Sequence, residues 1–130
     1  MGCSIKLYKI NDFIRKNESG ELDLEKSRKI VRELADAASS NPESNILVDL
    51  RDTTLKGVSM GEILQIAIEL ALYKSVFKNK MATIIPDTPD RLVTAEQFKI
   101  SLQYKGFEYN FFTSLDDAIE WFSEIEDFVE

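Results

Sequence analysis

Two carboxylates follow an apolar segment in the middle of the sequence, and they are the first candidates for chemistry. A buried strand is predicted over residues 45–50, with Asp49 near its end and Asp52 just beyond it. Paired carboxylates can exchange protons with a substrate or hold Mg²⁺. They can equally cap turns or pair with a nearby cation, here Arg51 or Lys56. The sequence leaves both interpretations open.

The residues that follow carry hydroxyl groups and glycine, and they lead into a long helix. Thr53, Thr54, Lys56 and Gly57 form a segment that could hold a small anion with its backbone amides. The segment lacks the glycine spacing and the Lys-Ser/Thr pair of a P-loop, so the anion motif is weak. The two threonines are also candidate sites of phosphorylation.

Ser59 stands where the long helix is expected to begin, and its spacing to Glu62 fits a capping box. In that motif the serine hydroxyl accepts an amide hydrogen from the first turn, and the glutamate reaches back. Phosphorylation of Ser59 is a second and compatible interpretation, because helix N-termini favour negative charge. We therefore predict a partner- or ligand-binding corner at residues 52–61, preceded by Asp49. Its candidate residues are Asp49, Asp52, Lys56, Gly57, Val58, Ser59, Met60 and Gly61.

The composition excludes several classes of site. The sequence contains no histidine, which removes Ser-His-Asp and Cys-His catalytic arrangements and any histidine ligand for zinc. Its single cysteine, Cys3, cannot form an internal disulfide, which fits a reducing compartment. The net charge of −7 argues against nucleic acid and anionic membranes as partners. We expect a cytoplasmic protein without cofactor, metal or membrane insertion.

Alternating strand and helix patterns predict an α/β class. Strands are expected over residues 4–10, from 13 to a turn signal at 17–20, and over residues 45–50, 80–86 and 107–113. The first two are expected to pair as a hairpin. Helices are expected over residues 23–39, 59–77, 88–106 and from 114 to near 129. Helices that cross between strands imply a mostly parallel sheet, here of about five strands with four helices. We treat residues 1–130 as a single domain.

The helix predicted over residues 59–77 is the most apolar segment of the chain. Its apolar residues leave only a narrow polar line through Glu62, Gln65 and Glu69. A surface helix normally buries one stripe, whereas this helix needs cover on two sides. Either neighbouring helices flank it, or it contacts another chain.

Three local patterns, in order along the sequence, resemble a known family. They are Gly20-Glu21-Leu22-Asp23 before a helix, Ile46-Leu47-Val48-Asp49-Leu50, and FTSLDDAIEWF over residues 112–122. Together with the order of elements, they resemble the STAS family of sulfate-transporter and anti-sigma-factor-antagonist domains, especially its SpoIIAA-like branch.

The resemblance implies a non-enzymatic, partner-binding module of bacterial signalling. The partner would be an anti-sigma-factor- or kinase-like protein that phosphorylates a serine in the corner after the central strand. When Val48-Asp49-Leu50 is aligned with the family's central strand, the family's acid falls on Gly57 and its phosphorylated serine on Val58. Ser59 matches the hydroxyl that follows.

These observations predict a STAS-like regulatory module that binds a protein through the corner, with phosphorylation at Ser59, Thr53 or Thr54 as a control. Self-association through the helix over residues 59–77 is part of the same hypothesis. The alternative is a module that holds an anion, nucleotide or lipid between the corner and the helix beginning near Thr88. An enzyme ranks last, because no set of base, nucleophile or metal ligands is complete.

Overall fold

The computed structural model describes residues 4–8, 13–55 and 57–129, with side chains placed over residues 13–55 and 57–124. The strands are β1 (Ser4–Tyr8), β2 (Phe13–Leu22), β3 (Asn45–Leu55), β4 (Met81–Ile84), β5 (Tyr109–Phe112) and β6 (Glu124–Val129). The helices are α1 (Leu24–Ser40), α2 (Met60–Leu72), α3 (Pro89–Tyr104) and α4 (Leu115–Ser123). In this described part of the chain, no helix is both long and apolar enough to cross a bilayer.

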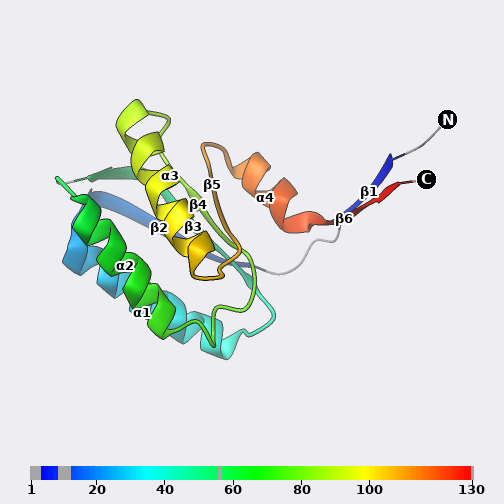
Figure 1. The fold of residues 1–130 in the computed structure, drawn as a ribbon, viewed down its shortest axis with the longest axis horizontal. Helices are drawn as coiled ribbons and strands as arrows, with labels where there is room; N and C mark the ends of the chain where they lie inside the picture. Colours follow the sequence, from blue (N-terminus) through cyan, green and yellow to red (C-terminus); the bar gives the residue numbers. More distant parts are fainter. Residues whose placement is uncertain (1–3, 9–12, 56, 130) are drawn as a thin grey trace.

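Strands β2, β3, β4 and β5 form a parallel sheet in the order of the sequence. Helices α1, α2 and α3 cover one face, and α4 lies against the other (Figure 1). The layers follow from β3, where Ile46 and Val48 join the cluster under α1–α3 while Leu47 packs with Ala118 and Phe122 of α4. A strand buried on both faces has a continuous apolar sequence. The α/β class, the four helices and the parallel sheet are confirmed for the described residues.

The predicted N-terminal hairpin is wrong, and the main sheet has four strands rather than about five. β1 pairs antiparallel with β6 in a separate two-stranded ribbon (Figure 1). β2 is instead the parallel edge strand beside β3. Residues 17–20, which the sequence suggested as a turn, lie inside β2. Their polarity suits an edge strand, because one row of its backbone groups and part of its side chains face water.

The last helix is shorter than the sequence predicted. α4 ends at Ser123, and the segment after it forms β6 instead of further helical turns. The acidic residues Glu124, Glu126 and Asp127 would have stood at the C-terminal end of a longer helix. The helix dipole disfavours negative charge there, so the extended conformation is the better choice.

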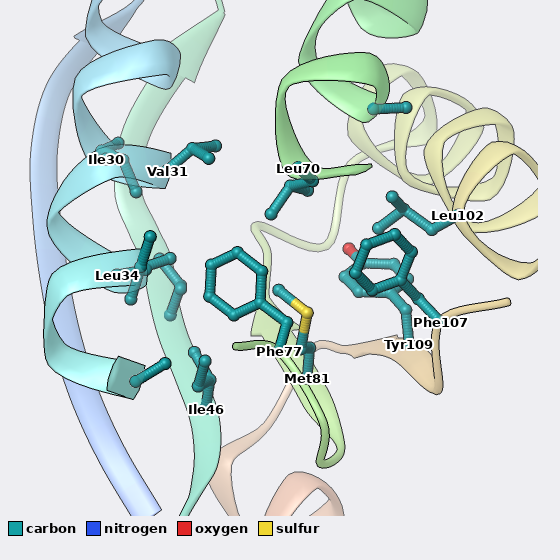
Figure 2. Close-up of a cluster of buried hydrophobic side chains, with 14 of the residues drawn as sticks. Ile30, Val31, Leu34, Ile46, Leu70, Phe77, Met81, Leu102, Phe107 and Tyr109 are labelled. Carbon is teal, nitrogen blue, oxygen red and sulfur yellow. The ribbon is translucent and has the colours of Figure 1, made fainter. Parts of the chain in front are cut away.

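α2 also ends before the predicted limit, at Leu72 instead of Phe77. The chain continues in turns, with the Phe77 N–H donating to the Tyr73 carbonyl at 3.2 Å. Phe77 is nevertheless buried, and Figure 2 shows it between Leu34 of α1 and Met81 of β4. The apolar residues after α2 therefore cover the core beyond the C-terminal end of that helix.

A register shift in β3 changes which of its side chains face the helices. Asn17 pairs with Asp49 and Ser19 with Asp52, so two steps along β2 span three along β3. An extra residue of this kind is a β-bulge, which re-aims the side chains beyond it. It reverses the alternation of faces for the rest of the strand.

The part of β3 beyond the bulge forms half of the predicted corner. The strand runs to Leu55, so Asp52, Thr53 and Thr54 lie in a strand and not in a loop. Thr53 is buried on the side of α1–α3, although strict alternation from Val48 would have placed it on the other face. The bulge is therefore the reason that a threonine enters the space under the helices.

Candidate functional site

Ser59 is the N-cap of α2, and the predicted capping box is confirmed. The Glu62 backbone N–H donates to the Ser59 Oγ at 3.2 Å, and the Ser59 N–H donates to Glu62 Oε1 at 3.4 Å. Gly57 has a φ of 51°, a left-handed conformation that favours glycine. Ser59, Met60 and Gly61 are exposed. The hydroxyl of Ser59 thus faces solvent while it stabilises the helix start.

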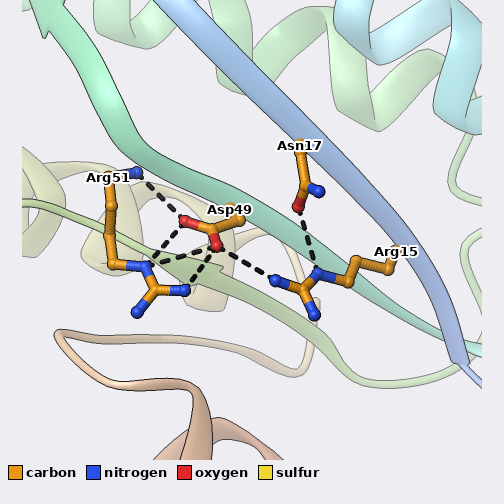
Figure 3. Close-up of polar contacts among 4 residues, drawn as sticks. All are labelled: Arg15, Asn17, Asp49 and Arg51. Carbon is orange, nitrogen blue, oxygen red and sulfur yellow. Dashed lines mark hydrogen bonds and ion pairs between the residues drawn. The ribbon is translucent and has the colours of Figure 1, made fainter.

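Asp49 lies on the opposite face of the sheet, between two guanidinium groups (Figure 3). Arg51 Nη2 donates to Asp49 Oδ2 at 2.7 Å, and Arg51 Nε donates to Oδ1 at 3.0 Å. Arg15 Nη2 adds a contact to Oδ2 at 3.4 Å, while its Nε donates to Asn17 Oδ1 at 3.1 Å. The side chains come from β2 and β3, which pair Asn17 with Asp49.

This cluster supports the ion-pair interpretation of Asp49. The hydrogen bond from Arg51 lowers the pKa of Asp49, and the charges of Arg51 and Arg15 lower it further against the effect of burial. A carboxylate held ionised in this way is a poor proton acceptor at neutral pH. Asp52 is exposed, and Asp49 forms its ion pairs with Arg51 and Arg15. Among the described residues, no three Cys, Asp or Glu side chains gather as a metal site.

The remaining corner residues are not brought together. The Thr53 hydroxyl is buried and donates to the Leu50 carbonyl at 2.6 Å, whereas Thr54 is exposed. Val58 is half-buried, and Lys56 lies outside the described residues. The proposed anion cradle of backbone amides is therefore not assembled by Thr53 and Thr54, which lie in a strand. Phosphorylation of Ser59 or Thr54 stays a prediction, and Thr53 is shielded by its burial.

A cavity of about 150 Å³ lies between the sheet and helices α1, α2 and α3. It is partly open to solvent, and most of its wall is aliphatic. Representative wall residues are Ile30 of α1, Val48 of β3, Ile63 and Leu70 of α2, and Ala95 of α3. Leu55 and Val58 bring the corner to its rim. The cavity therefore lies between the corner and α3, where the alternative sequence hypothesis expected a ligand.

Arg91 is the one charged residue among the described residues of the cavity wall. It is 6% exposed and stands in the first turns of α3. Its Nη1 donates to the Thr53 carbonyl at 2.8 Å, and its Nη2 donates to the Thr53 Oγ1 at 3.0 Å. Burial lowers the pKa of Arg91, while the nearby charge of Asp90 acts in the other direction. The β3 bulge thus supplies a neutral partner to a buried cation.

Sequence reasoning did not single out Arg91, although a signal was present. Arg91 recurs at helical spacing with Ala95, Phe98 and Leu102, the residues that α3 turns toward the sheet. A charged residue in register with a buried stripe is unusual, because charged side chains are rarely buried without a partner. That break in the pattern would have identified it.

A second polar feature of the cavity wall lies on β4 and β5. The hydroxyls of Thr83 on β4 and Tyr109 on β5 lie 2.6 Å apart and share a hydrogen bond. Tyr109 is 4% exposed, and burial raises its pKa far above the usual value. Both residues line the cavity, but their hydroxyls satisfy each other. Ser27 and Thr94 also line the cavity. Arg91 is the charged group of the described wall, and its guanidinium has more N–H donors than its two hydrogen bonds use.

The sequence was also compared with known proteins. No family model matches the chain, and no curated protein matches it.

Proposed function

We propose that the chain is a small-molecule binding module that holds an apolar ligand in the cavity under α1–α3. The observation that carries the proposal is a void of about 150 Å³ with a mostly aliphatic wall. Natural interiors are close-packed and contain few voids larger than a water molecule. At roughly 24 cal/mol per Å³, an enclosed empty cavity of this volume would cost about 3–4 kcal/mol, which is an upper limit for this partly open one. A ligand that fills the cavity recovers part of that free energy.

The size of the cavity limits the ligand. An engineered apolar cavity of about 150 Å³ in another protein stays dry and binds benzene. By this comparison, the cavity accepts one aromatic ring or a short acyl chain. Its partial opening leaves room for the end of a slightly longer molecule. A whole nucleotide is too large and too polar for such a wall.

Thermal unfolding with neutral probes tests this proposal. Toluene and 1-octanol should raise the melting temperature of the protein, since a ligand at 100 times its Kd adds roughly 2.7 kcal/mol of stability. Ala95→Leu should remove the effect, because Ala95 lines the cavity. Ala37→Leu is the matched control on α1, outside the cavity wall. An equal response of the two variants, or no response of the wild type, would contradict the proposal.

A second candidate function, interaction with another protein, is favoured by two exposed apolar rows on adjacent helices. The row on α2 is Met60, Leu64, Ile68 and Leu72, and the row on α3 is Val93, Ile100 and Tyr104. Their exposed fractions run from 44% to 92%. Exposed apolar side chains that gather on adjacent helices mark interaction surfaces more often than singly scattered ones do.

We propose a second copy of the chain as the occupant of these rows. Helices α2 and α3 lie side by side and run in the same direction (Figure 1). Exposed acids Asp87 and Asp90 stand at the N-terminal end of the pair, and Lys74 and Lys105 at the C-terminal end. An antiparallel two-fold contact would therefore place basic ends against acidic ends.

Sedimentation over a range of concentrations tests this second candidate. A dimer should form in the wild type and be lost in Ile68→Glu. Ser39→Glu adds a glutamate at an exposed position on α1, away from the rows, and should leave the dimer intact. A monomer at high concentration would remove self-association as a function.

Membership of the STAS family and control through Ser59 stay proposals, supported by the sequence patterns and the exposed N-cap. Intact mass after incubation with lysate and ATP tests the phosphate.

A further inference from the structure

We infer that the cavity selects ligands that carry a carboxylate on a small apolar body, and that Arg91 binds the carboxylate. The inference rests on the proposed ligand-binding function and specifies its ligand class. The observation behind it is one charged side chain in an otherwise uncharged wall. Arg91 is 6% exposed, and the other described wall residues are uncharged.

The guanidinium of Arg91 lacks the partner that a buried cation needs. Its two hydrogen bonds both go to Thr53, a neutral residue. No carboxylate of a described residue forms an ion pair with it. Buried charges are normally paired, because desolvation of an ion costs several kcal/mol. An anion that enters the cavity would supply the missing charge.

Asp90, the neighbour in sequence, does not fill this role. Its exposed carboxylate lies in the first turn of α3, where a hydrogen bond with the Thr88 side chain is the main cause of its lowered pKa. It acts on Arg91 only through space. The guanidinium also has more N–H donors than its two bonds to Thr53 use. These spare donors are available to an anion in the cavity.

The chemistry of the wall favours a carboxylate over a phosphate. One guanidinium matches the two oxygens of one carboxylate in a forked pair. A phosphate dianion would bring a second negative charge into a wall whose described residues offer no further cation. The volume of about 150 Å³ leaves space for a ring or a chain of about six to eight carbons. Short fatty acids and arylalkanoic acids fit these limits.

Titration calorimetry with octanoate and 1-octanol tests the inference, because the two compounds share an apolar chain and differ in charge. The wild type should bind octanoate at least about tenfold more tightly than 1-octanol at pH 7. Arg91→Met should lower the affinity for octanoate by about 100-fold and leave that for 1-octanol within about threefold, as expected for one lost charged partner. Arg32→Met is the control, since it removes an exposed arginine outside the cavity wall.

The outcomes separate the inference from the function on which it rests. Equal affinity of the wild type for both compounds, or an unchanged octanoate preference in Arg91→Met, would overturn the role of Arg91 alone. Binding of neither compound would overturn the ligand-binding function itself. Arg91→Lys keeps the charge without the fork and should give an intermediate preference, which preserves the test where Arg91→Met fails to fold. Octanoate should also lose its advantage below about pH 5, where the ligand becomes protonated.

Discussion

Replacing Arg91 by methionine should stabilise the protein when no ligand is bound. The change removes a buried cation whose partners are the carbonyl and hydroxyl of Thr53, and it leaves a side chain of similar length. Proteins rarely gain stability when a buried hydrogen-bonded residue is replaced. The direction of the effect therefore distinguishes a binding residue from a structural one.

The magnitude follows from three contributions. Two hydrogen bonds from a charged donor are lost, at about 1.5–3 kcal/mol each. The desolvation penalty of the ion, several kcal/mol, disappears. Burial of the methionine end adds about 1–2 kcal/mol. The first two contributions nearly cancel, so the burial of the methionine end leaves an expected gain of about 1–2 kcal/mol.

Urea and thermal unfolding of the ligand-free protein measure this balance. A gain of that size would raise the melting temperature by roughly 3–8 °C for a chain of this length. Arg91→Ala is the comparison variant, because it removes the same charge but leaves an empty space and should destabilise the protein. A loss of more than about 2 kcal/mol in Arg91→Met would refute the reasoning, since Arg91 would then serve mainly to hold Thr53.

Three further predictions concern the corner and the opposite face. Asp49→Asn should lower the stability at pH 7 by about 1–2 kcal/mol, measured by urea unfolding. Because the folded-state pKa of Asp49 is lowered, chiefly by Arg51, its contribution is present above the unfolded pKa of about 3.9 and lost as pH falls further. The variant should therefore lose less stability than the wild type below about pH 4. Ser59→Ala should cost about 1 kcal/mol and Ser59→Asp much less, because aspartate also caps helices. Gly57→Ala should cost about 1 kcal/mol through its positive φ, and an unchanged unfolding midpoint would show that the turn adapts.

Local patterns in the sequence were sufficient for much of the fold. The continuous apolar run of β3 indicated a strand covered on both faces, and Leu47 is indeed fully buried. The N-cap Ser59 was identified from its residue type and its spacing to Glu62, and it accepts the expected amide hydrogen bond. These features depend on residues within one turn or one strand, so the chain reveals them without its tertiary structure.

Pairings between distant segments were not predictable in the same way. β1 pairs with β6, more than a hundred residues away, whereas the next segment in sequence seemed the obvious partner. Strand pairing depends on which edges remain free after the sheet has formed, and alternation within a strand does not encode that. The same limit hid the bulge in β3, because a bulge is defined by its partner strand.

The site shows both sides of this limit. The sequence placed function at the corner, and Leu55 and Val58 of the corner do line the cavity. It also predicted Thr53 as part of an anion-binding segment and as a candidate for phosphorylation, whereas the residue is buried beyond the bulge. Arg91 and Thr53 meet only because the bulge turns one strand end toward α3. A contact of that kind belongs to the tertiary structure and leaves only a weak trace, a charge in an apolar stripe, in the sequence.

The most direct test of ligand binding is a methyl-NMR titration of the wild type with 1-octanol. Ile63 and Leu70 line the cavity and are almost fully buried, whereas Ile68 and Leu72 stand on the exposed row of the same helix. We predict saturable shifts of the Ile63 and Leu70 methyl signals, with those of Ile68 and Leu72 little changed. Shifts confined to Ile68 and Leu72, or no saturable shift at any methyl, would contradict a ligand site under the helices.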